Sequence, residues 1–281
     1  MDFKTGFELS NGVRIPCIGF GTWQSRDGEG VAAVKSALEA GYRLIDTAAA
    51  YGNELSVGAA IRESCVPRDQ IFITSKLRNS AHGYDATMEA FEWSTQKLGT
   101  DYLDLYLIHW PNPLQFRPIW KEATRGTWRA FEALYRAGRI RAIGVSNFMP
   151  HHIEMLMETA SIQPMVNQLK LCPGITQDAA VEYCRARGIL VEAYSPFGTG
   201  SIFSAPEIRE IAARYRKSIG QVCLRWSLQM GYLPLPKSGN PARIRENLDV
   251  FDFDLSEEDM AKIASLKGSC GEAPDPDATN F

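Results

Sequence analysis

The chain has 281 residues, of which 45% are hydrophobic and 22% charged, a composition typical of a soluble globular protein with a sizeable core. Its net charge is −3 and its Lys and Arg residues form no tract, which argues against nucleic acid or an anionic membrane as the main partner. The six cysteines are scattered and form no Cys-x-x-Cys pair, which predicts reduced thiols and no metal site. The chain has no window of ~18 consecutive apolar residues and no apolar signal at its start, so a cytoplasmic protein is expected.

An Asn11-Gly12 pair near the start predicts a small β-hairpin. The segments on either side, 7–10 and 13–16, alternate as paired strands do. Because both residues of the pair tolerate a positive φ, we expect a two-residue turn. This hairpin would cap the main fold.

From residue 17 onward, short apolar runs alternate with longer amphipathic segments. Strands are predicted at 17–21, 43–47, 71–76, 103–109, 140–146, 164–170, 189–195 and 232–236. Helices are predicted at 30–40, 54–63, 86–98, 126–137, 151–160, 177–187, 205–216, 221–230, 241–248 and 256–266. Glycines follow four of these helices where a left-handed cap is expected: Gly41, Gly99, Gly138 and Gly188. Eight such units without a break in composition favour one α/β domain over residues 1–281, a (β/α)8 TIM barrel, over an open doubly wound sheet.

Two segments depart from this alternation. Residues 110–125 form a predicted long loop rich in Trp, Pro and Phe, and long loops are often functional. The C-terminal tail, residues 268–281, has no periodic pattern and either frays or, as we predict, lies over the barrel mouth. Neither segment marks a dimer interface, so a monomer is expected.

Four polar residues lie at or just beyond the ends of predicted strands: Asp46, Tyr51, Lys76 and His109. The ends of parallel strands converge on one face of a barrel, so these side chains would share one pocket. Taken singly, an Asp can cap a turn, a Tyr can sit at a rim and a His can be a core residue. A Lys on a buried strand, however, must find an anion or shift its pKa. Their joint occurrence at three successive strand ends favours a functional site.

This combination matches what the reduction of an aldehyde or a ketone requires. A proton must reach the carbonyl oxygen, and a Tyr hydroxyl with a pKa of about 10 is a weak acid near neutrality. A cationic Lys76 beside Tyr51 would lower that pKa, and Asp46 would keep the ammonium charged and oriented. His109 would donate a hydrogen bond to the same carbonyl oxygen. The hydride itself must come from a cofactor.

The segment after the last predicted strand carries a candidate phosphate site. Lys237, Ser238 and Arg243 surround a helix that begins at Pro241, and the free N–H groups of a helix N-terminus bind anions. The alternative is an ordinary basic surface turn, but barrels often bind phosphates in the loops after their last strands. Two cations suit the 2′-phosphate of NADP better than the bare ribose of NAD, so NADPH is the predicted cofactor.

Other residues on the same rim fit a nicotinamide. Ser146, Asn147 and Gln168 can bind a carboxamide, and Tyr194 offers a flat face for the ring. Each of them can equally serve to satisfy backbone groups. The loops also carry aromatic residues that either line an apolar pocket or only pack: Trp23, Trp110, Phe116 and Trp120.

These residues resemble those of an aldo-keto reductase. Residues 41–54 (Gly-Tyr-Arg-Leu-Ile-Asp-Thr-Ala-Ala-Ala-Tyr-Gly-Asn-Glu) are similar to the family's first signature, and residues 235–248 are similar to its Lys-Ser…Arg…Glu-Asn cofactor signature. Residues 143–148 and 194–196 match two further family segments. The resemblance runs in order over nearly the whole chain. In length and tail the chain looks most like bacterial reductases akin to 2,5-diketo-D-gluconate reductases.

The resemblance implies a (β/α)8 barrel, NADPH bound in extended form, and a tetrad of Asp46, Tyr51, Lys76 and His109. It implies substrate contacts from Trp23, Tyr51, His109 and Trp110. It implies cofactor contacts from Gly21, Thr22, Trp23, Asp46, Ser146, Asn147, Gln168, Tyr194, Ser195, Pro196, Phe197, Lys237, Ser238, Gly239, Arg243, Glu246 and Asn247. Arg78 stands where many relatives carry an aromatic residue, and we expect it to admit more polar or anionic substrates.

Two other functions remain open alongside this one. A class I aldolase-type barrel would form a Schiff base on Lys76, which borohydride would trap with bound substrate. A nucleotide-sensing subunit would bind NADPH without turnover. In either enzyme reading the expected partner is a small carbonyl compound.

Overall fold

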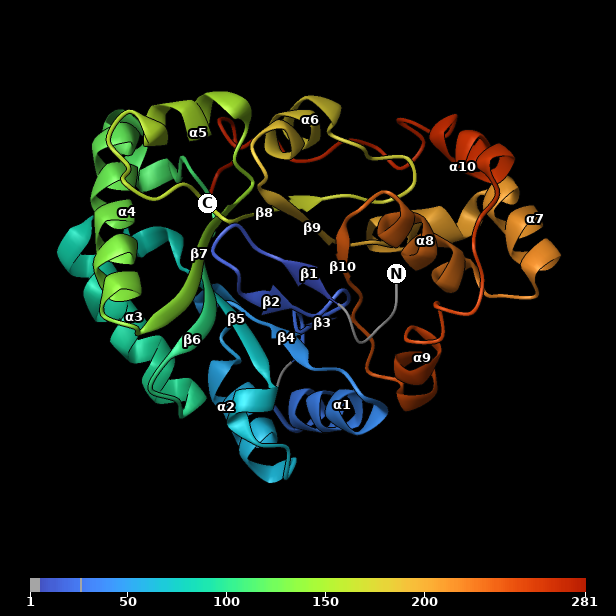
Figure 1. Ribbon diagram of the computed structural model, residues 1–281, viewed down its shortest axis with the longest axis horizontal. Helices are drawn as coiled ribbons and strands as arrows, with labels where there is room; N and C mark the ends of the chain where they lie inside the picture. The colour runs from blue at the N-terminus through green and yellow to red at the C-terminus, as the bar shows by residue number, and fades with distance from the viewer. Residues whose placement is uncertain (1–5, 26) are drawn as a thin grey trace.

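Eight parallel strands form one barrel within the part of the chain that the computed structural model describes, residues 6–25 and 27–281 (Figure 1). In chain order they are β3 (Phe20–Gly21), β4 (Leu44–Asp46), β5 (Phe72–Leu77), β6 (Leu103–Ile108), β7 (Ile140–Ser146), β8 (Val166–Lys170), β9 (Leu190–Tyr194) and β10 (Leu233–Leu235). Each strand pairs with the next one along the chain. The predicted barrel fold is confirmed, and every predicted strand overlaps an observed one.

The barrel closes between its first and last strands. Gly19 N donates to Pro234 O at 3.1 Å, and Gly21 N donates to Pro236 O at 3.0 Å. A Cβ atom at Gly19 would lie 2.6 Å from side-chain carbons of Leu44 and Leu235. Glycine is therefore what allows the first strand to approach its neighbours closely enough to close the barrel.

Helices surround the barrel and cover its outer face (Figure 1). They are α1 (Asp27–Ala40), α2 (Glu54–Glu63), α3 (Tyr84–Leu98), α4 (Trp120–Arg136), α5 (Pro150–Met157), α6 (Asp178–Ala186), α7 (Pro206–Tyr215), α8 (Ile219–Gln229), α9 (Pro241–Glu246) and α10 (Glu257–Ala264). The four glycines predicted to end helices all have a positive φ. Among the described residues, no helix combines the length and the apolar character needed to cross a membrane.

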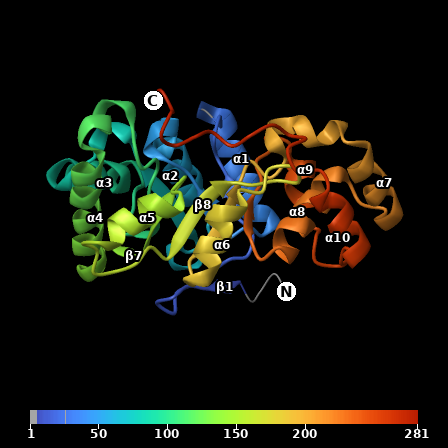
Figure 2. The ribbon, with the colours of Figure 1, turned by 90° about the horizontal axis from the view of Figure 1, so that it is seen from above.

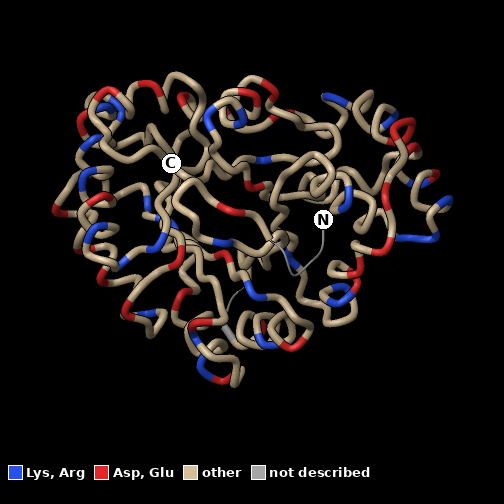
Figure 3. Tube along the Cα trace, viewed as in Figure 1, with Lys and Arg blue, Asp and Glu red and all other residues tan. Residues whose placement is uncertain are grey.

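The strands are buried on both faces because their side chains fill the barrel on one side and pack under the helices on the other. All six residues of β6 are buried, for example. Helix α4 turns Trp128 and Phe131 toward this core, where both are buried. Charged residues of both signs are interleaved over the outer helices (Figure 3).

The predicted N-terminal hairpin is confirmed, but its turn differs. Strand β1 (Phe7–Glu8) pairs antiparallel with β2 (Arg14–Ile15). Gly12 N donates to Leu9 O at 2.8 Å, and within the turn only Gly12 has a positive φ, of 81°. Residues 10–12 therefore form a three-residue loop with a left-handed glycine, and the predicted two-residue turn is wrong.

The hairpin and the C-terminal tail lie at opposite ends of the barrel (Figure 2). The tail, residues 268–281, crosses the mouth, which is the end where the strands reach their carboxyl termini. Leu114 N donates to Phe281 O at 3.3 Å, and Arg117 donates to Thr279 O. The predicted position of the tail over the mouth is confirmed.

The segment between β6 and α4 is more helical than predicted. It contains the 3₁₀ helix η4 (Leu114–Ile119), and α4 begins at Trp120, before the end of the predicted loop 110–125. Thr124 Oγ1 donates to Pro111 O at 3.0 Å and ties the first turn of α4 to the start of the segment. This contact spans the loop, so a local pattern does not reveal it.

Candidate active site at the barrel mouth

The mouth brings the four predicted catalytic residues together. Asp46 ends β4, Lys76 lies in β5 and His109 directly follows β6, so three of them come from neighbouring parallel strands. Tyr51 ends the short 3₁₀ helix η1 (Ala49–Tyr51), which lies between β4 and α2. The ring of Tyr51 lies edge-on to that of His109, with 5.8 Å between the ring centroids.

Lys76 forms the centre of this cluster. Its side chain is fully buried, and its Nζ donates to both carboxylate oxygens of Asp46, at 2.7 and 2.8 Å, and to Thr47 O at 3.0 Å. A buried ammonium is tolerated when it is paired and hydrogen-bonded in this way. Burial by itself lowers the pKa of Lys76, but the charge of Asp46 raises it, and the pKa lies above its ordinary value. Lys76 is therefore a fixed cation.

Tyr51 contacts this cation, yet its pKa moves in the direction opposite to the prediction. Lys76 Nζ lies 3.4 Å from Tyr51 Oη. Burial raises the pKa of Tyr51, the charge of Lys76 lowers it, and the charge of Asp46 raises it again, so that the pKa lies above its ordinary value. Burial prevails because the ammonium is already largely neutralised by a carboxylate. Tyr51 therefore keeps its proton at neutral pH.

His109 is a neutral imidazole on the wall of the same site. Burial, followed by the charge of Lys76, lowers the pKa of His109 to about 3. Its Nδ1 is buried without a hydrogen-bond partner among the described residues. A neutral imidazole carries one N–H, so His109 can donate one hydrogen bond toward a bound molecule.

Gln168 and Glu192 extend the cluster into the barrel interior. Gln168 Nε2 donates to Asp46 Oδ2 at 2.9 Å and to Glu192 Oε2 at 2.7 Å, which uses both amide protons. Glu192 is fully buried, and burial together with the charge of Asp46 raises the pKa of its carboxyl to about 8. Glu192 was not among the residues predicted from the sequence. An acidic residue inside an apolar strand, two positions before Tyr194, was the available signal.

A cavity of about 600 Å³ opens in front of Tyr51 and His109. All four predicted substrate contacts line it: Trp23, Tyr51, His109 and Trp110. The predicted cofactor residues that line it are Gly21, Trp23, Asp46, Ser146, Asn147, Gln168, Tyr194, Ser195, Pro196, Phe197 and Lys237. Lining residues that the cofactor and substrate predictions did not include are Gln24, Asn79, Lys170, Thr199, Gly200, Phe203, Leu235, Pro274 and Phe281.

Hydrogen bonds fix the polar wall of this cavity. Tyr194 Oη donates to Asn147 Oδ1 at 2.9 Å, and Asn147 Nδ2 donates to His109 O at 3.0 Å. Ser146 Oγ donates to Gln168 O at 3.0 Å. Hydrogen bonds from side chains therefore join the ends of β6, β7, β8 and β9. The bond to Asn147 holds the ring of Tyr194 in one position.

Several residues singled out from the sequence lie outside the cavity wall. Thr22 is fully buried and braces β4 by donating from Oγ1 to Asp46 O at 2.9 Å. Phe116 stacks on His82 and Trp120 packs edge-on against His152, so both pack rather than line the pocket. The other predicted cofactor residues outside the wall are Ser238, Gly239, Arg243, Glu246 and Asn247.

Arg78 does not occupy the position expected of it. Its side chain is exposed, and the neighbouring Asn79 lines the cavity instead. Because Arg78 is not among the lining residues, the expectation that it admits more polar or anionic substrates gains no support here and stays a prediction.

The predicted phosphate site after β10 is different in detail. Asn240 Oδ1 accepts from Ala242 N at 2.8 Å and from Arg243 N at 3.4 Å. These N–H groups of α9 were predicted to be free, and that prediction is wrong. The side chains of Lys237 and Arg243 are exposed, and neither makes an ion pair within residues 6–25 and 27–281. Cationic side chains, and not the helix N-terminus, therefore provide the donors that fit a phosphate here.

The barrel fold and the Tyr–Lys–Asp–His cluster together define a class of oxidoreductase. Residues 17–267 match the Aldo/keto reductase family, and the chain belongs to this family. It is 49% identical over 278 residues to YtbE of Bacillus subtilis, an oxidoreductase described as uncharacterized, with 97% of this chain and 96% of YtbE covered. It is 47% identical over 279 residues to the glyoxal reductase of Bacillus subtilis, with 99% and 98% covered.

Solved structures share the whole fold. MGS-M4, an aldo-keto reductase from a Medee basin deep-sea metagenome library, superposes with a TM-score of 0.93 at 42% identity and covers 98% of this chain and 100% of its own. A variant of Gox0644 in complex with NADPH has a TM-score of 0.91 at 38% identity and covers 98% of each chain. A Bombyx mori aldo-keto reductase in complex with NADP has a TM-score of 0.85 at 37% identity, covering 94% and 92%.

Proposed function

We propose that this protein reduces small aldehydes or ketones to alcohols with NADPH. The observation that carries the proposal is the phenol of Tyr51, whose oxygen lies 3.4 Å from the buried ammonium of Lys76 at the wall of the mouth cavity. A protonated phenol beside a fixed cation is a proton donor whose anion is stabilised after transfer. Family membership and the two relatives solved with NADP or NADPH support this reaction.

Each member of the cluster has one role in this reaction. NADPH, when bound, supplies the hydride that reaches the carbonyl carbon. Tyr51 donates its proton to the carbonyl oxygen, and Lys76 stabilises the phenolate that remains. Asp46 keeps the ammonium charged and oriented, and His109 donates a hydrogen bond to the carbonyl oxygen. Positioned acid–base groups of this kind contribute about 10²–10⁴ in rate.

We assign the nicotinamide to the ends of β7, β8 and β9. Ser146, Asn147 and Gln168 would hold the carboxamide as acceptors for its NH₂ group, because the protons of their hydroxyl and amide groups are already engaged. Tyr194, held by Asn147, would lie against the nicotinamide ring. Further cofactor contacts remain predictions: Gly21, Thr22, Trp23, Ser195, Pro196, Phe197, Gly239, Glu246 and Asn247.

We assign the 2′-phosphate of the cofactor to Lys237, Ser238 and Arg243. Lys237 lies on the cavity wall, and its ammonium and the Arg243 guanidinium are unpaired within the described part of the chain. Charge-assisted hydrogen bonds to phosphate are roughly twice as strong as neutral ones. This arrangement favours NADPH over NADH.

We expect the substrate to be compact. Trp23, Trp110 and Phe281 give the cavity that Tyr51 lines an aromatic wall. Such a wall excludes water, and Tyr51 and His109 are the polar groups that we assign to the carbonyl oxygen. A relative named glyoxal reductase makes glyoxal a natural first member of a substrate panel.

Tyr51→Phe tests the assignment of the acid. We expect turnover to fall by about 10²–10⁴, because the variant lacks the proton donor, while NADPH binds within two-fold of wild type. NADPH absorbance would be followed against aldehydes, ketones and keto-sugars, with NADH in parallel, and binding by fluorescence. Tyr84→Phe, at an exposed tyrosine, removes the same atom as a control. Wild-type turnover in Tyr51→Phe would show that the acid is misassigned.

The Schiff-base alternative is not favoured by the state of Lys76. A nucleophilic amine must be neutral, whereas Lys76 is fully buried, paired with Asp46 and has a raised pKa. Borohydride treatment of wild type with substrate tests this, since it would label Lys76 only in an aldolase. A nucleotide-sensing subunit would instead bind NADPH but would not oxidise it with any carbonyl compound of the panel.

We also propose that the protein acts as a cytoplasmic monomer with one domain over residues 1–281. Sedimentation of the purified protein with and without NADPH tests the monomer directly. A concentration-dependent mass would contradict it.

A further inference from the structure

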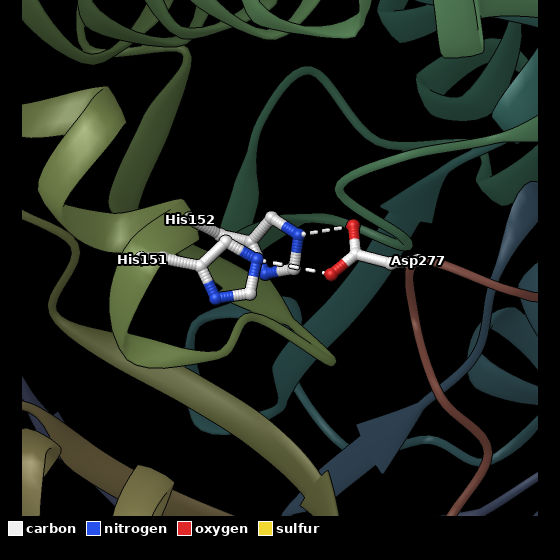
Figure 4. A group of neighbouring side chains, drawn as sticks. All are labelled: His151, His152 and Asp277. Atoms are coloured by element: carbon white, nitrogen blue, oxygen red, sulfur yellow. Dashed lines mark hydrogen bonds and ion pairs between the residues drawn. The ribbon is translucent and has the colours of Figure 1, made fainter.

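A cluster of two histidines and an aspartate lies beside the mouth, outside the catalytic cluster (Figure 4). His151 and His152 lie in the first turn of α5, and Asp277 lies in the C-terminal tail. His152 Nε2 lies 3.0 Å from Asp277 Oδ1, and His151 Nε2 lies 3.0 Å from Asp277 Oδ2. Asn112 Nδ2 donates to Asp277 Oδ1 at 2.9 Å. One carboxylate therefore joins the tail to two other segments.

The hydrogen-bond pattern determines which ring nitrogen of each histidine donates to Asp277, and it fixes the tautomer of His152. An ionised carboxylate only accepts, so His151 and His152 each donate from Nε2. In agreement with this, Nδ1 of His152 accepts from Met149 N at 3.1 Å and has no proton of its own. His152 thus serves as a neutral donor to Asp277, and His151 donates to the other carboxylate oxygen.

The same pattern argues against a metal ion, although the three ligand atoms lie within 4.8 Å of one another. A metal bound to Nε2 of His152 would require the ring proton on Nδ1, because a neutral imidazole carries one proton. That proton would then face the N–H of Met149, whereas a metal-bound histidine donates its second N–H to an acceptor. We therefore treat the cluster as a clasp of hydrogen bonds.

The clasp is already formed at neutral pH. His152 is fully buried, between the rings of Trp120 and Phe148, and burial lowers its pKa to about 4, against the opposing charges of Asp277 and Asp275. Burial raises the pKa of Asp277, but the bond from Asn112 and the neighbouring histidines lower it, and it lies below its ordinary value. At neutral pH His152 is therefore neutral and Asp277 is ionised, which are the states that the hydrogen bonds between them require.

Beyond the clasp, the tail continues onto the substrate side of the cavity. Arg117 donates to Thr279 O, and Leu114 N donates to Phe281 O at 3.3 Å. The ring of Phe281 lies edge-on to Trp110 with 4.9 Å between the ring centroids, and both rings line the cavity with Tyr51. The segment that Asp277 anchors is thus the one that carries Phe281 onto the cavity wall beside Trp110.

We propose that Asp277 is a positioning residue, which clasps the tail to α5 and to the segment after β6 so that Phe281 closes the substrate end of the cavity. This role rests on the proposed carbonyl reduction only for its effect on substrate binding. The anchoring of the tail is independent of any activity.

Asp277→Asn tests the clasp, because an amide replaces the charged acceptor without a change in size. Glu272→Gln is the matched control, since it removes the same charge from an exposed position of the same tail. The first measurement is amide hydrogen exchange over residues 277–279, whose N–H groups are hydrogen-bonded within the tail. We expect exchange to become at least about ten-fold faster in Asp277→Asn and to stay unchanged in Glu272→Gln. Unchanged exchange in Asp277→Asn overturns the clasp whether or not any carbonyl is reduced.

The second measurement separates positioning from chemistry. With the best substrate of the carbonyl panel, we expect Asp277→Asn to raise KM about ten-fold, with kcat and the Kd for NADPH within two-fold of wild type. Faster exchange with an unchanged KM overturns the positioning role. If the wild type reduces no carbonyl while exchange still responds, the proposed function fails and the anchoring stands. A chelator should leave wild-type exchange unaltered; faster exchange on chelation would show a metal site instead.

Discussion

Two groups of basic side chains lie at the barrel mouth, and the protein holds them in opposite ways. Lys76 is fully buried, with its Nζ 2.7 Å from Asp46 Oδ1. Lys237 and Arg243 are exposed beyond β10, and no ion-pair partner for either lies in the described part of the chain. The protein itself neutralises the first cation and leaves the other two available to an external anion.

In the proposed function, this difference separates the residues of the chemistry from those that bind the cofactor. Burying an ion pair costs desolvation energy, which is acceptable where a charge must stay in one place next to a reacting group. Exposed cations carry little of that cost and suit a phosphate that must bind and leave. Changes at Lys76 should therefore affect stability and turnover together, whereas changes at Lys237 or Arg243 should affect cofactor affinity alone.

The largest effect is expected from Lys76→Met. The variant leaves the Asp46 carboxylate buried without its partner, which should lower the free energy of unfolding by about 3–5 kcal/mol. It also removes the cation beside Tyr51, so turnover should fall by at least about 10². Urea unfolding and NADPH oxidation measure the two effects. Lys35→Met, which breaks the exposed pair with Glu63, is the control and should change stability by less than about 1 kcal/mol. Equal stability of the two variants would break the contrast between buried and exposed cations.

A smaller, pH-dependent effect is expected from Glu192→Gln. Burial raises the pKa of Glu192 from 4.5 to about 8, so its contribution to stability is fully present below about pH 4.5 and is lost as pH rises toward 8. Relative to wild type, the Gln variant should gain about 1 kcal/mol per pH unit between pH 5 and 8, because it cannot ionise. The free energy of unfolding of both proteins at three pH values measures this. A constant difference would mean that Glu192 is ionised throughout, and that the interior of the cluster carries more charge than its geometry indicates.

The smallest effects are expected from Lys237→Ala and Arg243→Ala. Each should raise the Kd for NADPH about ten-fold, roughly 1.4 kcal/mol, and leave the Kd for NADH unchanged, because only NADPH carries the 2′-phosphate. Stability should stay within about 0.5 kcal/mol of wild type, since both residues are exposed. Arg245→Ala, at an exposed position of the same helix, is the control. If the variants lost as much affinity for NADH as for NADPH, these cations would contact a part of the cofactor other than the 2′-phosphate.

Local sequence patterns were sufficient to predict the barrel and the convergence of the four residues Asp46, Tyr51, Lys76 and His109. Apolar runs of strand length alternate with amphipathic segments along the chain, and parallel strands bring their ends to one face. Asp46, Lys76 and His109 could be placed together on that ground alone, since each lies at a strand end. The hairpin was also predictable, although the hydrogen bond from Gly12 to Leu9 set a longer loop than the Asn-Gly pair indicated.

Other features depend on contacts between distant segments, which no local pattern encodes. The pKa of Tyr51 depends on how deeply the assembled mouth buries it, and burial outweighed the predicted influence of Lys76. Glu192 became part of the cluster through a bond to Gln168 on the neighbouring strand. The capping of α9 by Asn240, in contrast, is a local contact over two and three residues, and an Asn directly before Pro241 was an available signal for it.

The sequence by itself determined which elements form and which polar residues end the strands, because hydrophobic periodicity and strand ends are properties of short segments. Only the tertiary structure decided the ionisation of those residues and the path of the tail. Asp277 meets His152 across 125 positions of the chain, and desolvation is set by everything packed around a group rather than by its neighbours in sequence. The fold class could therefore be predicted from the sequence, whereas the electrostatics of the site and the closure of its cavity depend on tertiary packing.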